Sequence, residues 1–311
     1  MTQIIPAPVS FATPASTRDI LRSMLPRWEP KTVPVFLADG TEAGRAVVRD
    51  DAPIPLGLVG GAYSPITHAR IAEGLAPVLD VIGADASSAV FRSYRGGRQA
   101  SLSITVPRYD GLQVRGDRFG RSIVVTLWYS HDTSIDVSLA VDAMRKICTN
   151  GMHALRGILP ESHTKHTTNG ELRFVRDAAA FAGLLSSGVD RAVRLLDAFG
   201  AYRMSPESVR AVLDQAIGVV GEPTPQQTRK IGDVVDLVQD ADGRYVPASD
   251  LTALSLFEAA TAYDRHRAPI RRRADTEGTD DDRRTLALVA SGGGLGARVR
   301  RILQAQILPD V

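Results

Sequence analysis

Cysteine is almost missing from this chain: its 311 residues contain one, Cys148, so an intramolecular disulfide is excluded. Aromatic residues make up only 5%, which argues against a binding surface built from many stacked rings. No run approaches the roughly 18 consecutive apolar residues of a membrane span. The N-terminus also lacks the basic and then apolar pattern of a signal peptide. We therefore expect a soluble protein of a reducing, cytoplasmic compartment.

Lysine is scarce as well. Of 37 basic residues only Lys31, Lys146, Lys165 and Lys230 are lysines, and the others are arginines. Arginine suits bidentate contacts with phosphate, although the same bias also follows from GC-rich coding. The net charge is only +2, so the distribution of charge along the chain is more informative than its total.

Hydrophobic patterning predicts an α+β fold, with a central antiparallel β-meander followed by a helix and with a helical C-terminal half. The pattern divides the chain into a flexible arm, an α+β core, a helical region, and an acidic linker with a last helical segment: residues 1–30, 31–170, 171–270 and 271–311. Within the arm, residues 16–25 form a short amphipathic segment.

The core begins with a predicted hairpin over residues 33–49 that turns at Asp39-Gly40. A short strand and a helix from Ser64 to Ile82 follow. Four further runs are predicted as consecutive antiparallel strands, 88–94, 98–106, 122–129 and 135–141, and apolar and polar residues alternate in the second and the fourth. Later helices are predicted over 171–186, 189–202, 206–217, 225–238 and 249–266.

Basic residues cluster in and after the predicted meander. Residues 92–121 hold seven arginines against two acids, and residues 145–176 are basic too. Such a cluster indicates a groove that follows a phosphate backbone, with tyrosine supplying a stacking face. The candidate nucleic-acid-binding residues are Arg92, Tyr94, Arg95, Arg98, Arg108, Arg115, Arg118, Arg121, Arg145, Lys146, Lys165 and His166. The alternative is a solvated sheet edge kept positive to prevent aggregation.

Catalytic and metal sites are weakly indicated. Cys148, near Asn150, invites a thiol-nucleophile interpretation, but no histidine is fixed beside it, and a lone cysteine is more often a small buried hydrophobe. His163 and His166 have the spacing of two zinc ligands, yet the chain offers no complete set of four. The glycine-rich run at 291–296 lacks the lysine of a phosphate loop. We predict no catalytic residue, metal or cofactor.

Several segments, in order along the chain, resemble the phage- and plasmid-borne family called "domain of unknown function 932". These are Trp28, Arg49-Asp50, Leu56–Gly60, Tyr63–Ile66, Gly96–Arg98, His131-Asp132, Cys148–Gly151, Lys165–Thr167 and Leu256–His266. The chain differs from the family pattern at Thr133, where glycine is usual, and in the helix containing Phe257, Glu258 and Ala262.

The β-meander and helix of that family look like the core of single-strand annealing recombinases, the class of RecT, Red-beta and Erf. The resemblance implies a ring-forming homo-oligomer that binds and anneals single-stranded DNA without nucleotide hydrolysis. Its partners would be single-stranded DNA and an exonuclease or single-strand-binding protein, in the host cytoplasm if the chain is phage-encoded. The alternatives are a phage or plasmid assembly protein with no nucleic-acid role and a Cys148-dependent enzyme.

Overall fold

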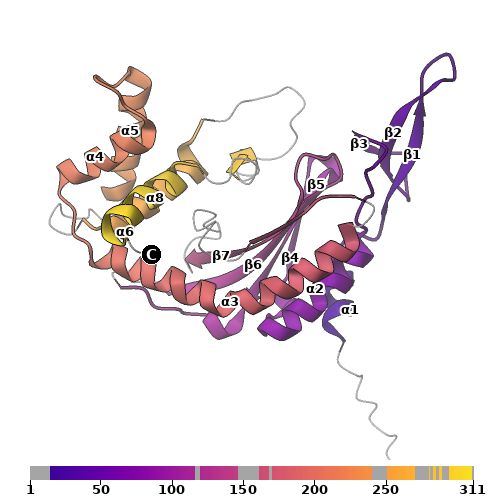
Figure 1. Cartoon of the computed structure of the whole chain (residues 1–311), viewed down its shortest axis with the longest axis horizontal. Coiled ribbons are helices and arrows are strands. Elements are labelled where there is room, and N and C mark those ends of the chain that lie inside the picture. The colour runs from indigo at the N-terminus through magenta and orange to yellow at the C-terminus, as the bar shows by residue number, and fades with distance from the viewer. Residues whose placement is uncertain are drawn as a thin grey trace, which may run out of the picture.

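The computed structural model describes residues 15–115, 120–145, 161–167, 170–239, 251–269, 280, 283–284, 287–288 and 294–309. These residues form a three-stranded and a five-stranded antiparallel sheet, with most helices in the C-terminal half (Figure 1). The predicted α+β class is confirmed. Among the described residues, no helix is both long and apolar enough to cross a membrane.

The small sheet consists of β1 (Pro30–Phe36), β2 (Glu42–Arg49) and β3 (Pro55–Val59), in that order. The predicted hairpin turns where expected, because Gly40 adopts a φ of 84° that glycine tolerates. The Asp39 carboxylate accepts a hydrogen bond from the Thr41 backbone N–H. The small sheet projects beyond one end of the larger one (Figure 1).

The five-stranded sheet is a meander in which spatial order follows sequence order. Its strands are β4 (Val90–Tyr94), β5 (Gln99–Val106), β6 (Arg121–Ser130), β7 (Val137–Arg145) and β8 (Glu161–Thr164). Short 3₁₀ turns flank β4 and β5, namely η1 (Ala86–Ser88), η2 (Arg95–Gly97) and η3 (Pro107–Tyr109). The predicted meander is confirmed, and β8 extends it at one edge.

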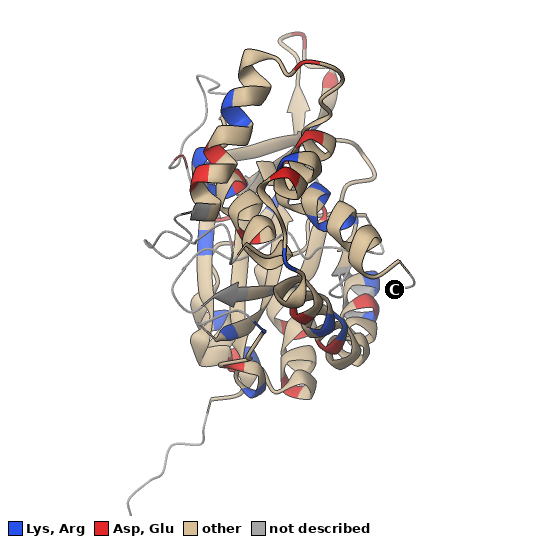
Figure 2. Cartoon of the chain, turned by 90° about the vertical axis from the view of Figure 1, so that its left-hand side faces the viewer, with Lys and Arg blue, Asp and Glu red and all other residues tan. Residues whose placement is uncertain are grey.

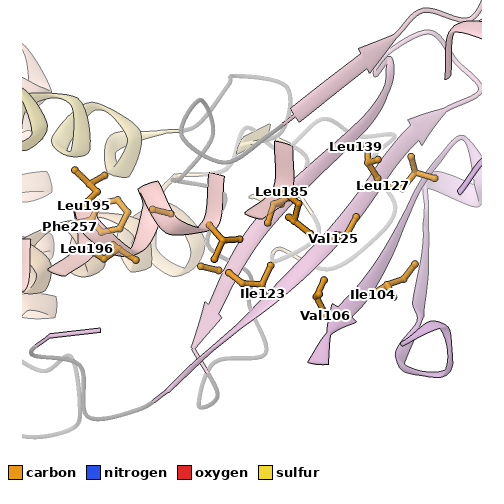
Figure 3. Close-up of a cluster of buried hydrophobic side chains, with 14 of the residues drawn as sticks. Ile104, Val106, Ile123, Val125, Leu127, Leu139, Leu185, Leu195, Leu196 and Phe257 are labelled. Carbon is orange, nitrogen blue, oxygen red and sulfur yellow. The ribbon is translucent and has the colours of Figure 1, made fainter. Parts of the chain in front are cut away.

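Helices α2 (His68–Ile82) and α3 (Gly170–Ala201) cover one face of this sheet (Figure 1). Apolar strand residues point from β5, β6 and β7 toward Leu185 and the helical layer (Figure 3). The short helix α1 (Thr17–Met24) packs on α2 and buries Leu21 and Leu25. Residues 16–25 of the predicted arm are therefore packed against the core, and residues 1–14 lie outside the described part.

Helix α3 is continuous over 32 residues, where two helices were predicted. The polar run at 186–188 does not interrupt it, because Leu185 and Val189 are both buried on the same side. At 1.5 Å per residue the helix is about 48 Å long, so it reaches both ends of the sheet.

The C-terminal helices are α4 (Pro206–Ile217), α5 (Pro225–Gln239), α6 (Ala253–Ala262), a π-helical turn η6 (Tyr263–Arg267) and α8 (Leu295–Ile307). The predicted N-cap Ser205 accepts a hydrogen bond from the Ser208 N–H. Helix α6 packs on α3 through Phe257, whose ring lies 6.0 Å from that of Phe199. These helices gather at the end of the molecule opposite the small sheet (Figure 1).

Candidate functional site

The end of the five-stranded sheet next to the small sheet collects three segments. They are the β4–β5 connection at 95–98, the β6–β7 connection at 131–136 and the residues that follow β8, 165–167. We call this the turn end. The backbone N–H of His131 donates to the carbonyl of Arg98 (2.7 Å), which ties two of the connections together.

Six ring side chains meet beneath the turn end, and we call them the histidine junction: Trp28, Tyr63, His68, Tyr129, His131 and His166. The Trp28 ring centroid lies 4.6 Å from that of His68 and 5.6 Å from that of His131. The Tyr63 and His166 rings stack at 5.2 Å with an interplanar angle of 22°. The junction therefore joins the small sheet, α2, and the ends of β6 and β8.

Two glycines allow other segments to pack closely around the junction. A Cβ on Gly57 of β3 would lie 2.6 Å from the Cα of Asp132, so only glycine fits there without movement. A Cβ on Gly97 would lie 3.1 Å from the Trp28 indole. The guanidinium of Arg49 lies over the Trp28 ring, 5.0 Å from its centroid. These positions belong to the segments that carry the family resemblance, so residues scattered along the sequence form one spatial cluster.

Glu29 fixes the start of α2 within this cluster. Its carboxylate accepts hydrogen bonds from the backbone N–H groups of His68 (2.6 Å) and Ala69 (3.0 Å), where the helix leaves donors unsatisfied. It also pairs with Arg22 at 2.8 Å. Burial raises the pKa of Glu29, while these hydrogen bonds and Arg22 oppose that rise.

All three junction histidines are held neutral. Burial lowers the pKa of His68 and of His131 to about 3, and that of His166 to about 4. The Nδ1 atom of His68 lies 3.1 Å from the Tyr129 hydroxyl. Within the described part of the chain, the other ring nitrogens of the three histidines have no hydrogen-bond partner. No group of three or more His, Cys, Asp or Glu side chains suited to a metal occurs among the described residues.

The structure divides the predicted basic residues between opposite ends of the sheet. Arg92, Arg95, Arg98 and Lys165 lie at the turn end or on the edge strand β4 leading to it, and we call them the turn-end cations. Arg92, Arg98 and Lys165 are exposed. Arg95 is partly buried and has a φ of 51°, a conformation that is uncommon for a residue with a side chain.

Arg108 and Arg115 lie at the other end, beside α3. The Arg108 guanidinium donates to the Ser186 hydroxyl (3.0 Å), and the Arg115 backbone N–H donates to the Asp197 carboxylate (2.7 Å). Because β5 has eight residues, this group lies about 25 Å from the turn end. The predicted cluster is thus two groups and not one continuous patch.

Three predicted contacts are buried. The Arg121 guanidinium forms an ion pair with the Glu258 carboxylate, Tyr94 stacks on Trp128 at 5.9 Å, and His166 belongs to the histidine junction. They are therefore not on the surface in this structure. Arg118, Lys146, the Arg145 side chain, Cys148 and Asn150 lie outside the described residues.

Hydroxyl groups line the sheet face opposite α2 and α3, as the alternation of serines with apolar residues in 98–106 predicts. Ser101, Ser103 and Thr126 share this face, since paired residues on neighbouring strands point the same way. Ser103 Oγ lies 3.4 Å from Thr126 Oγ1, and the Tyr94 hydroxyl lies 3.2 Å from Ser101 Oγ. Ser101 and Thr126 are buried.

Positions of both charges are interspersed along the helices on the C-terminal side of the molecule, with Lys and Arg blue and Asp and Glu red (Figure 2). Many surface arginines are neutralised locally, such as Arg49 by Asp51 and Arg210 by Asp214. The turn-end cations Arg92, Arg98 and Lys165 form no ion pair among the residues that the structure describes.

Comparison with known proteins returns no matching curated protein and no matching solved structure. A family model matches residues 55–288, a range that contains most of the histidine junction and all four turn-end cations. The chain therefore belongs to the family described as a domain of unknown function, DUF932.

Proposed function

We propose that this protein binds single-stranded DNA through its sugar–phosphate backbone at the turn end of the five-stranded sheet. The observation that carries the proposal is the set of exposed cations Arg92, Arg98 and Lys165, none of which has an ion-pair partner in the described chain. Unpaired cations on a rigid edge attract phosphates and gain affinity by releasing counterions.

The spacing of these cations suits a strand that crosses the sheet ends. Arg98 directly precedes β5, and Lys165 directly follows β8, three strands away. At about 4.8 Å between neighbouring strands, they lie about 14 Å apart. A DNA strand running across the strand ends would place successive phosphates near them, with no contact that reads the base sequence.

The histidine junction supports this surface from below. It holds the β4–β5 and β6–β7 connections against the small sheet, so the cations are presented on a fixed frame. Backbone binding of this kind leaves base edges free to pair with a second strand. We therefore propose strand annealing by a homo-oligomer, without nucleotide hydrolysis, as the activity of this surface.

The proposal is tested by fluorescence anisotropy with labelled single-stranded and duplex DNA over a salt series. We expect single-strand binding that weakens steeply with salt. The double variant Arg98→Ala/Lys165→Ala should bind at least tenfold more weakly, at about 1 kcal/mol or more for each lost phosphate contact. The matched control Arg108→Ala removes a cation at the other end of the sheet and should change binding little.

Absence of binding at low salt by folded protein would refute the proposal. It would favour a second candidate, an assembly or interaction protein without a nucleic-acid role. The projecting small sheet favours this second candidate, because it exposes Phe36 (58%), Leu37 (56%) and Leu58 (75%) to solvent. The same preparation examined by analytical ultracentrifugation, with and without Leu58→Ser, would test that role.

A further inference from the structure

A separate cavity lies between α5 and the π-helical turn η6. Helix α5 is at the end of the molecule away from the small sheet (Figure 1). The cavity has a volume of about 410 Å³, which lies within the usual range for small-molecule sites. Helix α5 contributes Arg229, Lys230 and Asp233 to its wall, and the π-helical turn η6 contributes Tyr263 and Arg267. Single π-helical turns of this kind often occur at functional sites.

The cavity wall carries an excess of positive charge. Three cations face one carboxylate, that of Asp233. Arg267 is engaged, since its guanidinium donates to the Asp233 carbonyl (3.2 Å) and lies 3.7 Å from the Asp236 carboxylate. Arg229 and Lys230, in contrast, form no ion pair with any residue in the described ranges.

Lys230 is the most constrained of these cations. Its ammonium lies 5.3 Å from the centroid of the Tyr263 ring, a cation–π contact that orients it. Burial lowers the pKa of Lys230, and nearby Arg298 of α8 lowers it further, while Asp264 opposes the shift. Lys230 and Asp264 form no ion pair in the described chain, and the Asp264 carboxylate accepts a hydrogen bond from the Gly296 N–H (2.8 Å) at the start of α8.

We propose that this cavity binds a small phosphorylated molecule, with Arg229 and Lys230 contacting its phosphate groups. A dianionic phosphate supplies the negative charge that the wall lacks, and charge-assisted hydrogen bonds to arginine and lysine are strong. The volume exceeds that of one phosphate, so the remainder accommodates an organic part such as a nucleoside. Asp233 is placed to accept hydrogen bonds from its hydroxyl or amino groups.

The proposal is tested by isothermal titration calorimetry of the full chain with pyrophosphate, ADP and adenosine at low salt. We expect saturable binding of ADP and weaker binding of pyrophosphate, with no binding of adenosine. Lys230→Gln and Arg229→Gln should each weaken ADP binding about tenfold. Lys230→Arg keeps the charge and should retain most of the affinity, which separates loss of binding from loss of folding.

Arg210→Gln is the matched control, because Arg210 is an exposed arginine that pairs with Asp214 on α4. Its ADP affinity should equal that of the unchanged protein. Equal binding of adenosine, no saturable binding of either phosphate compound, or unchanged affinity in Lys230→Gln would each overturn the proposal. Displacement of ADP by an oligothymidylate would also overturn it, and would assign the cavity to a DNA phosphate.

Discussion

Arg121, the first residue of β6, forms a buried ion pair with Glu258 of α6, 137 residues further along the chain. The Arg121 side chain is fully enclosed, and that of Glu258 is 9% exposed. The pair connects the large sheet to the C-terminal helices at the end opposite the turn end.

Removing one member of this pair should be more damaging than removing both. Glu258→Ala removes the carboxylate that pairs with an enclosed guanidinium, and we expect the free energy of unfolding to fall by about 3–5 kcal/mol. The double variant Arg121→Met/Glu258→Leu should lose less, because neither charge stays buried alone. Chemical denaturation of the three proteins measures both quantities, and a double variant less stable than Glu258→Ala would contradict this account.

Because of the buried histidine junction, we expect the protein to become less stable toward unfolding in mild acid. His68, His131 and His166 are neutral in the folded state down to about pH 4, whereas unfolded histidine binds a proton below about pH 6.5. As the pH falls through this window, the unfolded state gains protons that the folded state does not. The free energy of unfolding should therefore decrease, by about 2 kcal/mol for each histidine at pH 5.

Urea denaturation at pH 7.5 and pH 5.0 measures this effect. His131→Gln should reduce the difference between the two pH values, although it also lowers stability at neutral pH by disturbing the junction. His163 is exposed on β8, so His163→Gln is the control, because it replaces a histidine and leaves the junction intact. Equal stability at both pH values would contradict this account, because it would mean that the junction histidines can bind protons in the folded state as readily as in the unfolded state.

Gly57 should be the most restrictive glycine of the small sheet. Gly57→Ala places a methyl group 2.6 Å from the Cα of Asp132, and backbone must move to relieve the overlap. We expect a loss of about 1–3 kcal/mol, seen as a lower midpoint in thermal unfolding. Gly60→Ala is the control, since no atom lies within 4 Å of a Cβ built there. A Gly57 variant as stable as the Gly60 variant would exclude a fixed contact between the two sheets.

At Thr133, in contrast, we expect replacement by glycine to stabilise the protein. This residue follows His131-Asp132 and has a φ of 62°, which is unfavourable for a β-branched side chain. Thr133→Gly should therefore raise the free energy of unfolding, by about 1 kcal/mol. Thr105→Gly, in the interior of β5, should lower it. A destabilised Thr133→Gly protein would indicate that the threonine side chain makes a contact that offsets the backbone strain.

Strands β5 and β6 were predictable from the sequence, because each buries one complete face of apolar residues. The sequence pattern missed β8, since Glu161–Thr164 is a short polar edge strand that carries no alternation of apolar residues. It also divided α3 at 186–188, where local residues favour a break but the buried neighbours Leu185 and Val189 keep the helix continuous. Local patterns cannot report such packing.

The candidate site was less predictable. Counting arginines grouped Arg98, Arg108 and Arg121 together, while strand direction places the first far from the other two and burial removes Arg121 from the surface. The family resemblance marked Trp28, His131 and His166 as separate segments. Their meeting depends on pairing between distant strands, which no spacing along the chain reveals.

The meander has one more consequence, for the way this chain acquires its structure. From β4 to β8, every strand pairs with the strand just before or after it in the sequence, so each pairing closes a comparatively short loop. Sheets of this kind form from contacts of low sequence separation and fold faster than sheets built from distant strands. The hairpins can assemble one after another as the chain leaves the ribosome, whereas the Arg121–Glu258 contact must wait until α6 has been synthesised.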